Sequence, residues 1–135
     1  MNNLAVLIGR FGLALIFVIS GWGKIGGYEA TQGYMAAMGV PGGLLPLVIA
    51  AELLGGAAIL AGFLTRWAAL GLALFSVVAG VLFHGDIADQ NQFISLLKNI
   101  AIAGGFLALY ANGPGAFSVD AWLADKRPAR KAQLA

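Results

Sequence analysis

Four apolar stretches dominate the sequence, and each approaches the length that a helix needs to cross a lipid bilayer. They cover residues 4–23, 44–64, 67–83 and 93–110. A membrane-spanning helix requires about 20 mostly apolar residues. Because the second and third stretches are almost continuous, they predict a tight helical hairpin. The expected fold class is all-α, a transmembrane four-helix bundle followed by a short interfacial helix near the C-terminus.

The composition excludes the main alternatives to this fold. Hydrophobic residues make up 60% of the chain and charged residues 10%, whereas a soluble domain has about 25% charged residues. So few charges cannot cover a water-facing surface. The sequence also lacks the alternating polar and apolar strands of a membrane barrel. The absence of cysteine excludes thiolate metal sites within the chain, and the net charge of +2 gives no indication of nucleic-acid binding.

The basic residues between the stretches predict the orientation in the membrane. Four spans place both termini on the same side, and the opposite side carries Lys24. The side of the termini carries Arg66, Lys126, Arg127, Arg130 and Lys131. Because loops rich in lysine and arginine stay in the cytoplasm, we expect both termini to be cytoplasmic.

The loop between the first two stretches is the longest and predicts a further short helix. Residues 31–38 place Tyr34, Met35 and Met38 on one helical face, at spacings of three to four residues. This face would lie on the bundle. The glycines and proline that follow would then turn the chain back into the membrane.

The fourth apolar stretch ends at a cluster of helix-breaking residues, 112–115. Ser118 can cap a new helix that has Asp120 in its first turn, where a carboxylate meets the positive end of the helix dipole. We therefore expect a transmembrane domain over residues 1–111 and an interfacial helix with a basic cytoplasmic tail over residues 112–135.

Three charged residues, Arg10, Glu52 and Lys98, interrupt the apolar stretches. A charge at mid-bilayer costs at least about 2.5–3.5 kcal/mol, so each should have a partner or a function. At a rise of 1.5 Å per residue, Glu52 and Lys98 lie about 12 and 8 Å from the same membrane surface, and Arg10 lies below them. This predicts Glu52 as a hub between two cations. Two simpler interpretations stay open, a purely structural pair and basic side chains that extend to the nearest interface.

Several neighbouring residues could complete a site around Glu52. Asn99 follows Lys98, and Gly55 and Gly56 lie one turn beyond Glu52. Missing side chains there leave room for a ligand or for a neighbouring helix.

Two further residues lie at the non-cytoplasmic ends of the spans. His84 is the sole histidine, either a proton carrier at the mouth of the site or an interfacial residue. Lys24 either anchors the first span at the interface or faces inward toward Glu52.

Ordered short motifs extend along nearly the whole chain to Asp120. They are Gly9-Arg10, Ser20-Gly21 through Lys24, Gly39-Val40-Pro41, Glu52 with Gly55-Gly56, Gly62, Thr65-Arg66, His84, Lys98-Asn99, Gly104-Gly105 and Gly113-Pro114-Gly115 through Ser118. This set resembles the DoxX family of small bacterial membrane proteins. The resemblance implies a four-helix bundle in the bacterial inner membrane. It also implies a link to redox chemistry, because the family takes its name from a thiosulfate:quinone oxidoreductase.

These observations together predict a redox-associated membrane subunit that binds a quinone or a similar lipid-soluble ligand. We expect no intrinsic cofactor and no metal, so electrons would come from a partner protein, and copies of the chain could associate. The expected catalytic residues are Glu52, Lys98 and His84, and the expected ligand-binding residues are Arg10, Lys24, Asn99, Gly55 and Gly56. Two alternatives stay open, a non-enzymatic scaffold or assembly subunit and a small-solute transporter or channel formed by an oligomer.

Overall fold

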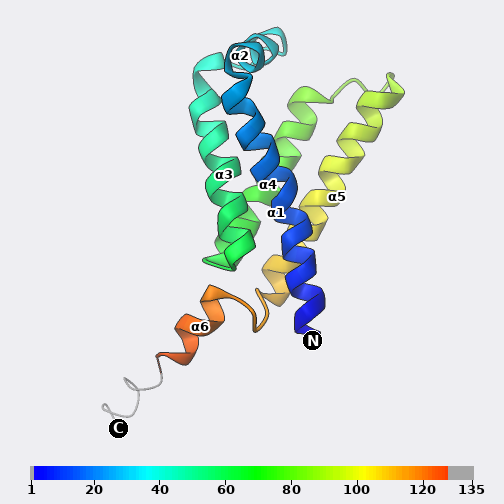
Figure 1. Ribbon diagram of the computed structural model, residues 1–135. Coiled ribbons are helices and arrows are strands. Elements are labelled where there is room, and N and C mark those ends of the chain that lie inside the picture. Colours follow the sequence, from blue (N-terminus) through cyan, green and yellow to red (C-terminus); the bar gives the residue numbers. More distant parts are fainter. Residues whose placement is uncertain (1, 128–135) are drawn as a thin grey trace.

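The computed structural model describes residues 2–127 and is built from helices (Figure 1). In chain order they are α1 (Asn3–Gly26), α2 (Tyr28–Ala37), a 3-10 turn (Gly42–Leu44), α3 (Leu45–Ala61), α4 (Thr65–Phe83), α5 (Gln90–Asn112) and α6 (Val119–Asp125). Four segments are long and apolar enough to cross a membrane, namely α1, α3 with its preceding turn, α4 and α5. The predicted all-α four-helix bundle is therefore confirmed. The predicted tail residues Arg130 and Lys131 lie outside the described part.

The long helices pack as two pairs. Helix α1 lies against α3, α4 lies against α5, and a smaller contact between α3 and α4 joins the pairs. In Figure 1, α2 lies at one end of the bundle, and the N-terminus and α6 lie at the other. We call these the α2 end and the α6 end. Toward the α2 end the α4–α5 pair diverges from α1 and α3 (Figure 1).

Apolar packing is concentrated in the half of the bundle nearer α6. The buried core consists of Ala14, Phe17, Ile59, Ala69, Leu72, Ala73, Ala103, Phe106 and Leu109. Most of these residues belong to the α6-end halves of their helices, where the two pairs are in contact. The α2-end halves diverge instead, and the space between them is the cavity described below.

Glycines set how closely the helices approach. A Cβ atom on Gly56 of α3 would lie 2.9 Å from Val18 of α1, and one on Gly80 of α4 would lie 2.8 Å from Asn99 of α5. Small residues at such contacts are how helices pack in lipid, where burial of apolar surface from water gives no driving force between them. Both pairs of long helices therefore depend on a glycine at their interface.

Helix boundaries differ slightly from the sequence-based expectation. Helix α1 continues to Gly26 instead of ending near residue 23, which keeps Lys24 in helical conformation. Helix α5 begins at Gln90, because the Asp89 side chain accepts a hydrogen bond from the Gln92 amide and caps the helix. Helix α3 ends at Ala61, because Gly62 adopts a left-handed conformation with φ of 70°.

Helix α6 is capped as expected, but Asp120 also acts on another helix. The Ser118 hydroxyl accepts a hydrogen bond from the Ala121 amide. The Asp120 carboxylate accepts hydrogen bonds from the Leu64 amide at 2.8 Å and the Thr65 amide at 2.9 Å. Helix α4 has no capping side chain of its own, so Asp120 satisfies its first amides from 55 residues away.

These contacts determine the pKa of the Asp120 carboxyl. Burial raises the pKa of this carboxyl, but the hydrogen bonds from Thr65 and Leu64 and the nearby charge of Arg10 outweigh burial and hold the pKa below its usual value. Since the folded-state pKa is depressed, the stabilisation is present above the unfolded-state pKa. It is lost as the pH falls through the folded-state pKa.

We expect Asp120→Ala to lower the free energy of unfolding by about 1 kcal/mol at neutral pH, the usual cost of losing a helix cap. The difference from the wild type should shrink as the pH falls below about 4, the ordinary pKa of a carboxyl, and should close below the depressed folded-state pKa. Thermal melts in mild detergent across this pH range would measure it. Asp125→Ala is the matched control, because Asp125 is exposed on the same helix. An effect of Asp120→Ala that is equal at pH 3 and pH 7 would contradict the capping role.

Candidate functional site

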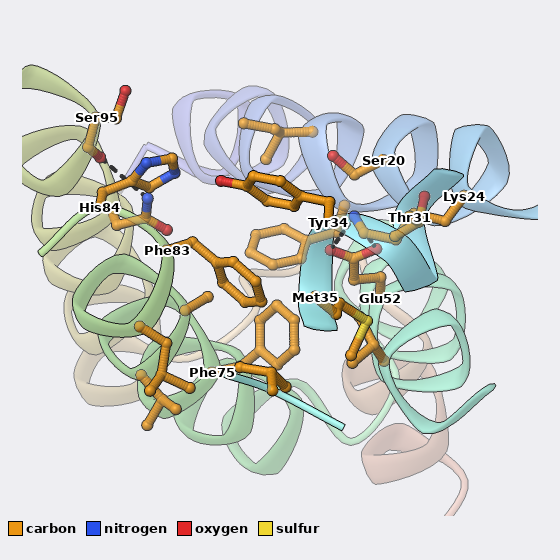
Figure 2. Close-up of a pocket in the computed structure, with 18 of the residues that line it drawn as sticks. Ser20, Lys24, Thr31, Tyr34, Met35, Glu52, Phe75, Phe83, His84 and Ser95 are labelled. Atoms are coloured by element: carbon orange, nitrogen blue, oxygen red, sulfur yellow. Dashed lines mark hydrogen bonds and ion pairs between the residues drawn. The ribbon is translucent and has the colours of Figure 1, made fainter. Parts of the chain in front are cut away.

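A cavity of about 550 Å³ lies between the two helix pairs in the half of the bundle nearer α2. Pockets for small molecules have volumes of about 300–1,000 Å³. Apolar side chains form most of the wall, among them Ile16, Phe17, Val48, Phe75, Val78, Leu82 and Ile102. Polar side chains gather on two sides. Figure 2 shows Ser20, Lys24 and Glu52 on one side of the cavity and His84 and Ser95 on the opposite side.

Aromatic rings form the space between these polar groups. Phe17 packs edge-to-face against Phe75, with ring centroids 6.1 Å apart. Tyr34 of α2 stacks on Phe83 of α4 at 5.5 Å between centroids, which joins the short helix to the α4–α5 pair. Met35 is also buried here, at 3% exposure. The predicted helix between the first two spans is thus present as α2, with Tyr34 and Met35 in the cavity wall. Met38, expected on the same face, lies just past the end of α2 and is exposed.

Glu52 is held by Lys24 and not by the two cations that the sequence analysis selected. The Lys24 ammonium donates to both carboxylate oxygens, at 3.0 Å to Oε1 and 2.9 Å to Oε2. Glu52 is 5% exposed. Gly21 makes this approach possible, because a Cβ atom there would lie 3.1 Å from the Glu52 Cβ. Of the two alternatives for Lys24, the structure shows the inward-facing one.

The expected contact between Arg10 and Glu52 is wrong. Arg10 lies 14 residues before Lys24, about 21 Å away along α1, and faces the α6 end. Its guanidinium donates four hydrogen bonds to backbone carbonyls, those of Ile59 at 3.0 Å, Leu60 at 2.8 Å, Pro114 at 2.7 Å and Phe117 at 2.8 Å. The last carbonyls of α3 have no partner within their own helix, and a cation at a helix C-terminus is favourable. Arg10 is therefore a packing residue outside the cavity.

The second polar side of the cavity comes from α4 and α5. His84 Nδ1 lies 2.7 Å from Gln92 Oε1, and the Asn99 amide donates to the Ser95 carbonyl at 3.0 Å. Lys98 lines the cavity together with Glu52, but within residues 2–127 the one ion pair is that of Lys24 with Glu52. The expected pair of Lys98 and Glu52 is thus not formed.

Gly55 and Gly56 do not open space for a ligand. A Cβ atom on Gly55 would lie 3.0 Å from Leu72 of α4, and one on Gly56 would meet Val18 of α1. Neither residue lines the cavity. The sequence analysis left a ligand and a neighbouring helix as alternatives, and the structure shows the neighbouring helix.

Several residues of the cavity wall were not among the site residues expected from the sequence. Ser20 and Thr31 contribute hydroxyl groups, and Phe75 and Phe83 contribute rings. Ser20 belongs to the motif that ends in Lys24, so this motif could have indicated it. The phenylalanines stand among many apolar residues and carry no distinguishing signal. Within residues 2–127, no group of three or more histidine, cysteine, aspartate or glutamate side chains is placed to hold a metal ion.

Comparison with known proteins gives the family. The family model named DoxX matches residues 5–85. The chain is 48% identical to inner membrane protein YqjF of Escherichia coli (strain K12) over 93% of this chain and 97% of the relative. It is 39% identical to inner membrane protein YphA of the same organism, over 85% of this chain and 87% of the relative. No solved structure is significantly similar to the chain. With four membrane-spanning helices and this match over most of its length, the chain belongs to the DoxX family of integral membrane proteins.

Proposed function

We propose that this protein binds a flat, lipid-soluble molecule of the quinone class in the cavity and acts as a redox-associated subunit of the bacterial inner membrane. The observation that carries the proposal is the distribution of polar groups in the cavity wall. Polar side chains stand on two opposite sides of an apolar space whose wall includes four aromatic rings (Figure 2). A quinone has the complementary form, an apolar ring with carbonyl oxygens on opposite sides.

The charged residues have distinct roles in this proposal. Lys24 and Lys98 would donate hydrogen bonds to the two carbonyl oxygens, an arrangement that stabilises negative charge on them. When a bound quinone is reduced it takes up protons as well as electrons. Glu52 and His84 are the residues of the wall that could hold and release a proton. Asn99 orients the wall through its hydrogen bond to Ser95. Electrons would be exchanged with a partner protein.

We also propose an orientation of the bundle in the membrane. The relatives are inner membrane proteins. Arg66 is the second residue of α4, whose first turn lies at the same end of the bundle as the N-terminus and α6 (Figure 1). Because basic residues stay in the cytoplasm, we place the α6 end in the cytoplasm, which puts the cavity in the outer half of the bilayer.

A cavity-filling substitution tests the proposed binding site. We expect Ala79→Phe, which adds a ring to the cavity wall of α4, to abolish binding of 2-methyl-1,4-naphthoquinone while the helical content and melting temperature stay close to wild type. Equilibrium dialysis with the protein in lipid nanodiscs would measure binding. Ala101→Phe is the matched control, because Ala101 is exposed outside the cavity wall. If wild type and Ala79→Phe retain the same amount of quinone above empty nanodiscs, the cavity is not the site.

One observation favours the scaffold alternative. The Lys24–Glu52 pair is closed on itself, with both carboxylate oxygens occupied by the same ammonium, as in a pair that serves packing alone. Under that alternative no quinone-class molecule binds to the wild type, so the same dialysis experiment separates the two proposals.

A further inference from the structure

The ionised side chains of the cavity do not cancel one another. Lys24 and Glu52 form a closed pair whose charges sum to zero. Lys98 adds one further positive charge to the lysine and glutamate side chains of the same wall. Within residues 2–127, Lys98 forms no ion pair. The cavity therefore has a net charge of +1 that the described protein does not balance.

Lys98 lies within a membrane span and lines the cavity with an exposed side chain. Lys98 is the ninth residue of α5, which begins at Gln90, so it lies about 12 Å along the helix axis from its start. Charged residues within membrane spans are rare, and they normally pair with one another or face a functional cavity. The acidic residues nearest in sequence to Lys98, Asp86 and Asp89, use carboxylate oxygens to accept hydrogen bonds from the Ala88 and Gln92 amides.

We infer that the cavity selects an anionic ligand, an amphiphile with an ionised acidic oxygen that lies against Lys98 and with its apolar body among the aromatic side chains. The inference rests on the proposed function and narrows its ligand class from neutral quinones to acidic ones. A charge-assisted hydrogen bond in an apolar site is stronger than one to a neutral carbonyl. A neutral ring would leave Lys98 without a counter-charge, whereas an enolate or carboxylate supplies one.

Two naphthoquinones of nearly equal size but different charge test whether the cavity prefers an anion. The first, 2-hydroxy-1,4-naphthoquinone, is ionised at neutral pH. The second, 2-methyl-1,4-naphthoquinone, is neutral. Equilibrium dialysis against protein in nanodiscs of zwitterionic lipid, corrected with empty nanodiscs, gives a dissociation constant for each. We expect the anion to bind the wild type at least tenfold more tightly, which corresponds to about 1.4 kcal/mol.

Variants of Lys98 test whether this side chain causes the preference for the anionic compound. Lys98→Met should bind both compounds with similar affinity, and Lys98→Arg should keep the preference for the anion. Lys126→Met is the control, because Lys126 lies over the Trp122 ring outside the cavity. The wild-type comparison needs no variant, so the inference stays testable even if Lys98→Met does not fold.

The outcomes distinguish this inference from the function on which it rests. If the neutral compound binds the wild type as tightly as the anion, the acidic-ligand inference is wrong and the quinone site stands. If neither compound binds, both are wrong. The acidic oxygen can belong to a ring or to a phospholipid headgroup. Repeating the dialysis in nanodiscs that contain phosphatidylglycerol shows which of the two the cavity binds. Displacement of the bound anion by this lipid would assign the position to a headgroup, and undiminished binding would assign it to an acidic ring.

Discussion

Arg10→Ala is expected to lower the free energy of unfolding by more than about 3 kcal/mol and to release the segment that follows α5. Arg10 is 2% exposed and donates to four backbone carbonyls, those of Ile59, Leu60, Pro114 and Phe117. Each buried acceptor that loses its partner costs about 1–3 kcal/mol. Thermal melts in detergent would measure the loss of stability, and limited proteolysis within residues 113–118 would measure the release.

A matched control separates this effect from a general loss of positive charge. Arg66→Ala removes an exposed arginine at the same end of the bundle and should change the melting temperature little. Arg10→Lys should recover part of the stability, because an ammonium can donate to some of the carbonyls but cannot reproduce the planar fork of a guanidinium. Equal destabilisation by Arg10→Ala and Arg66→Ala would contradict the assigned role of Arg10.

The second large effect is expected at the Lys24–Glu52 pair. Lys24→Met leaves the Glu52 carboxylate buried without a partner, a change that typically costs about 3–5 kcal/mol. The double variant Lys24→Met/Glu52→Gln removes both charges. It should therefore be more stable than Lys24→Met alone, with a coupling energy of at least about 2 kcal/mol in a double-mutant cycle on thermal stability.

A second cycle tests the specificity of this pairing. Lys98→Met and Glu52→Gln should combine additively to within about 0.5 kcal/mol, because Lys98 and Glu52 line the same cavity without an ion pair between them. Strong coupling between Lys98 and Glu52, together with weak coupling between Lys24 and Glu52, would show that the carboxylate is held by the other lysine.

Features that depend on residue type along the chain could be predicted from the sequence. The length and composition of the four apolar stretches fix the all-helical membrane fold. The helix between the first two spans follows from the spacing of Tyr34 and Met35 from Met38, and the cap of α6 follows from Ser118. Each of these features depends on residues that are close in sequence.

Features that depend on how two helices approach each other could not be predicted in this way. Depth in the membrane favoured Lys98 and Arg10 as the partners of Glu52 and left an inward-facing Lys24 as an alternative. The choice of Lys24 depends on Gly21, which lets α1 and α3 come close. The partners of Arg10 are backbone carbonyls, which no residue type marks. Asp120 was expected to act on its own helix, and its contact with α4 depends on the return of the chain after α5.

The charged residues form two groups, one at each end of the bundle. Arg10 and Asp120 hold the α6 end together, since Arg10 binds the end of α3 and the segment before α6 while Asp120 caps α4. Lys24, Glu52, His84 and Lys98 line the cavity at the other end. The two groups therefore predict different phenotypes. Substitutions of the first group, and of the Lys24–Glu52 pair, should reduce stability, whereas substitutions of Lys98 and His84 should alter ligand binding at nearly unchanged stability.

The most direct test of the proposed function is mass spectrometry of what co-purifies with the wild-type protein in mild detergent, run beside Ala79→Phe and Ala101→Phe. We expect a quinone-class or acidic aromatic molecule in stoichiometric amount with the wild type and with Ala101→Phe, and we expect its loss from Ala79→Phe. Membrane phospholipid alone, in the same amount with all three proteins, would contradict the account and would favour a scaffold role for the bundle.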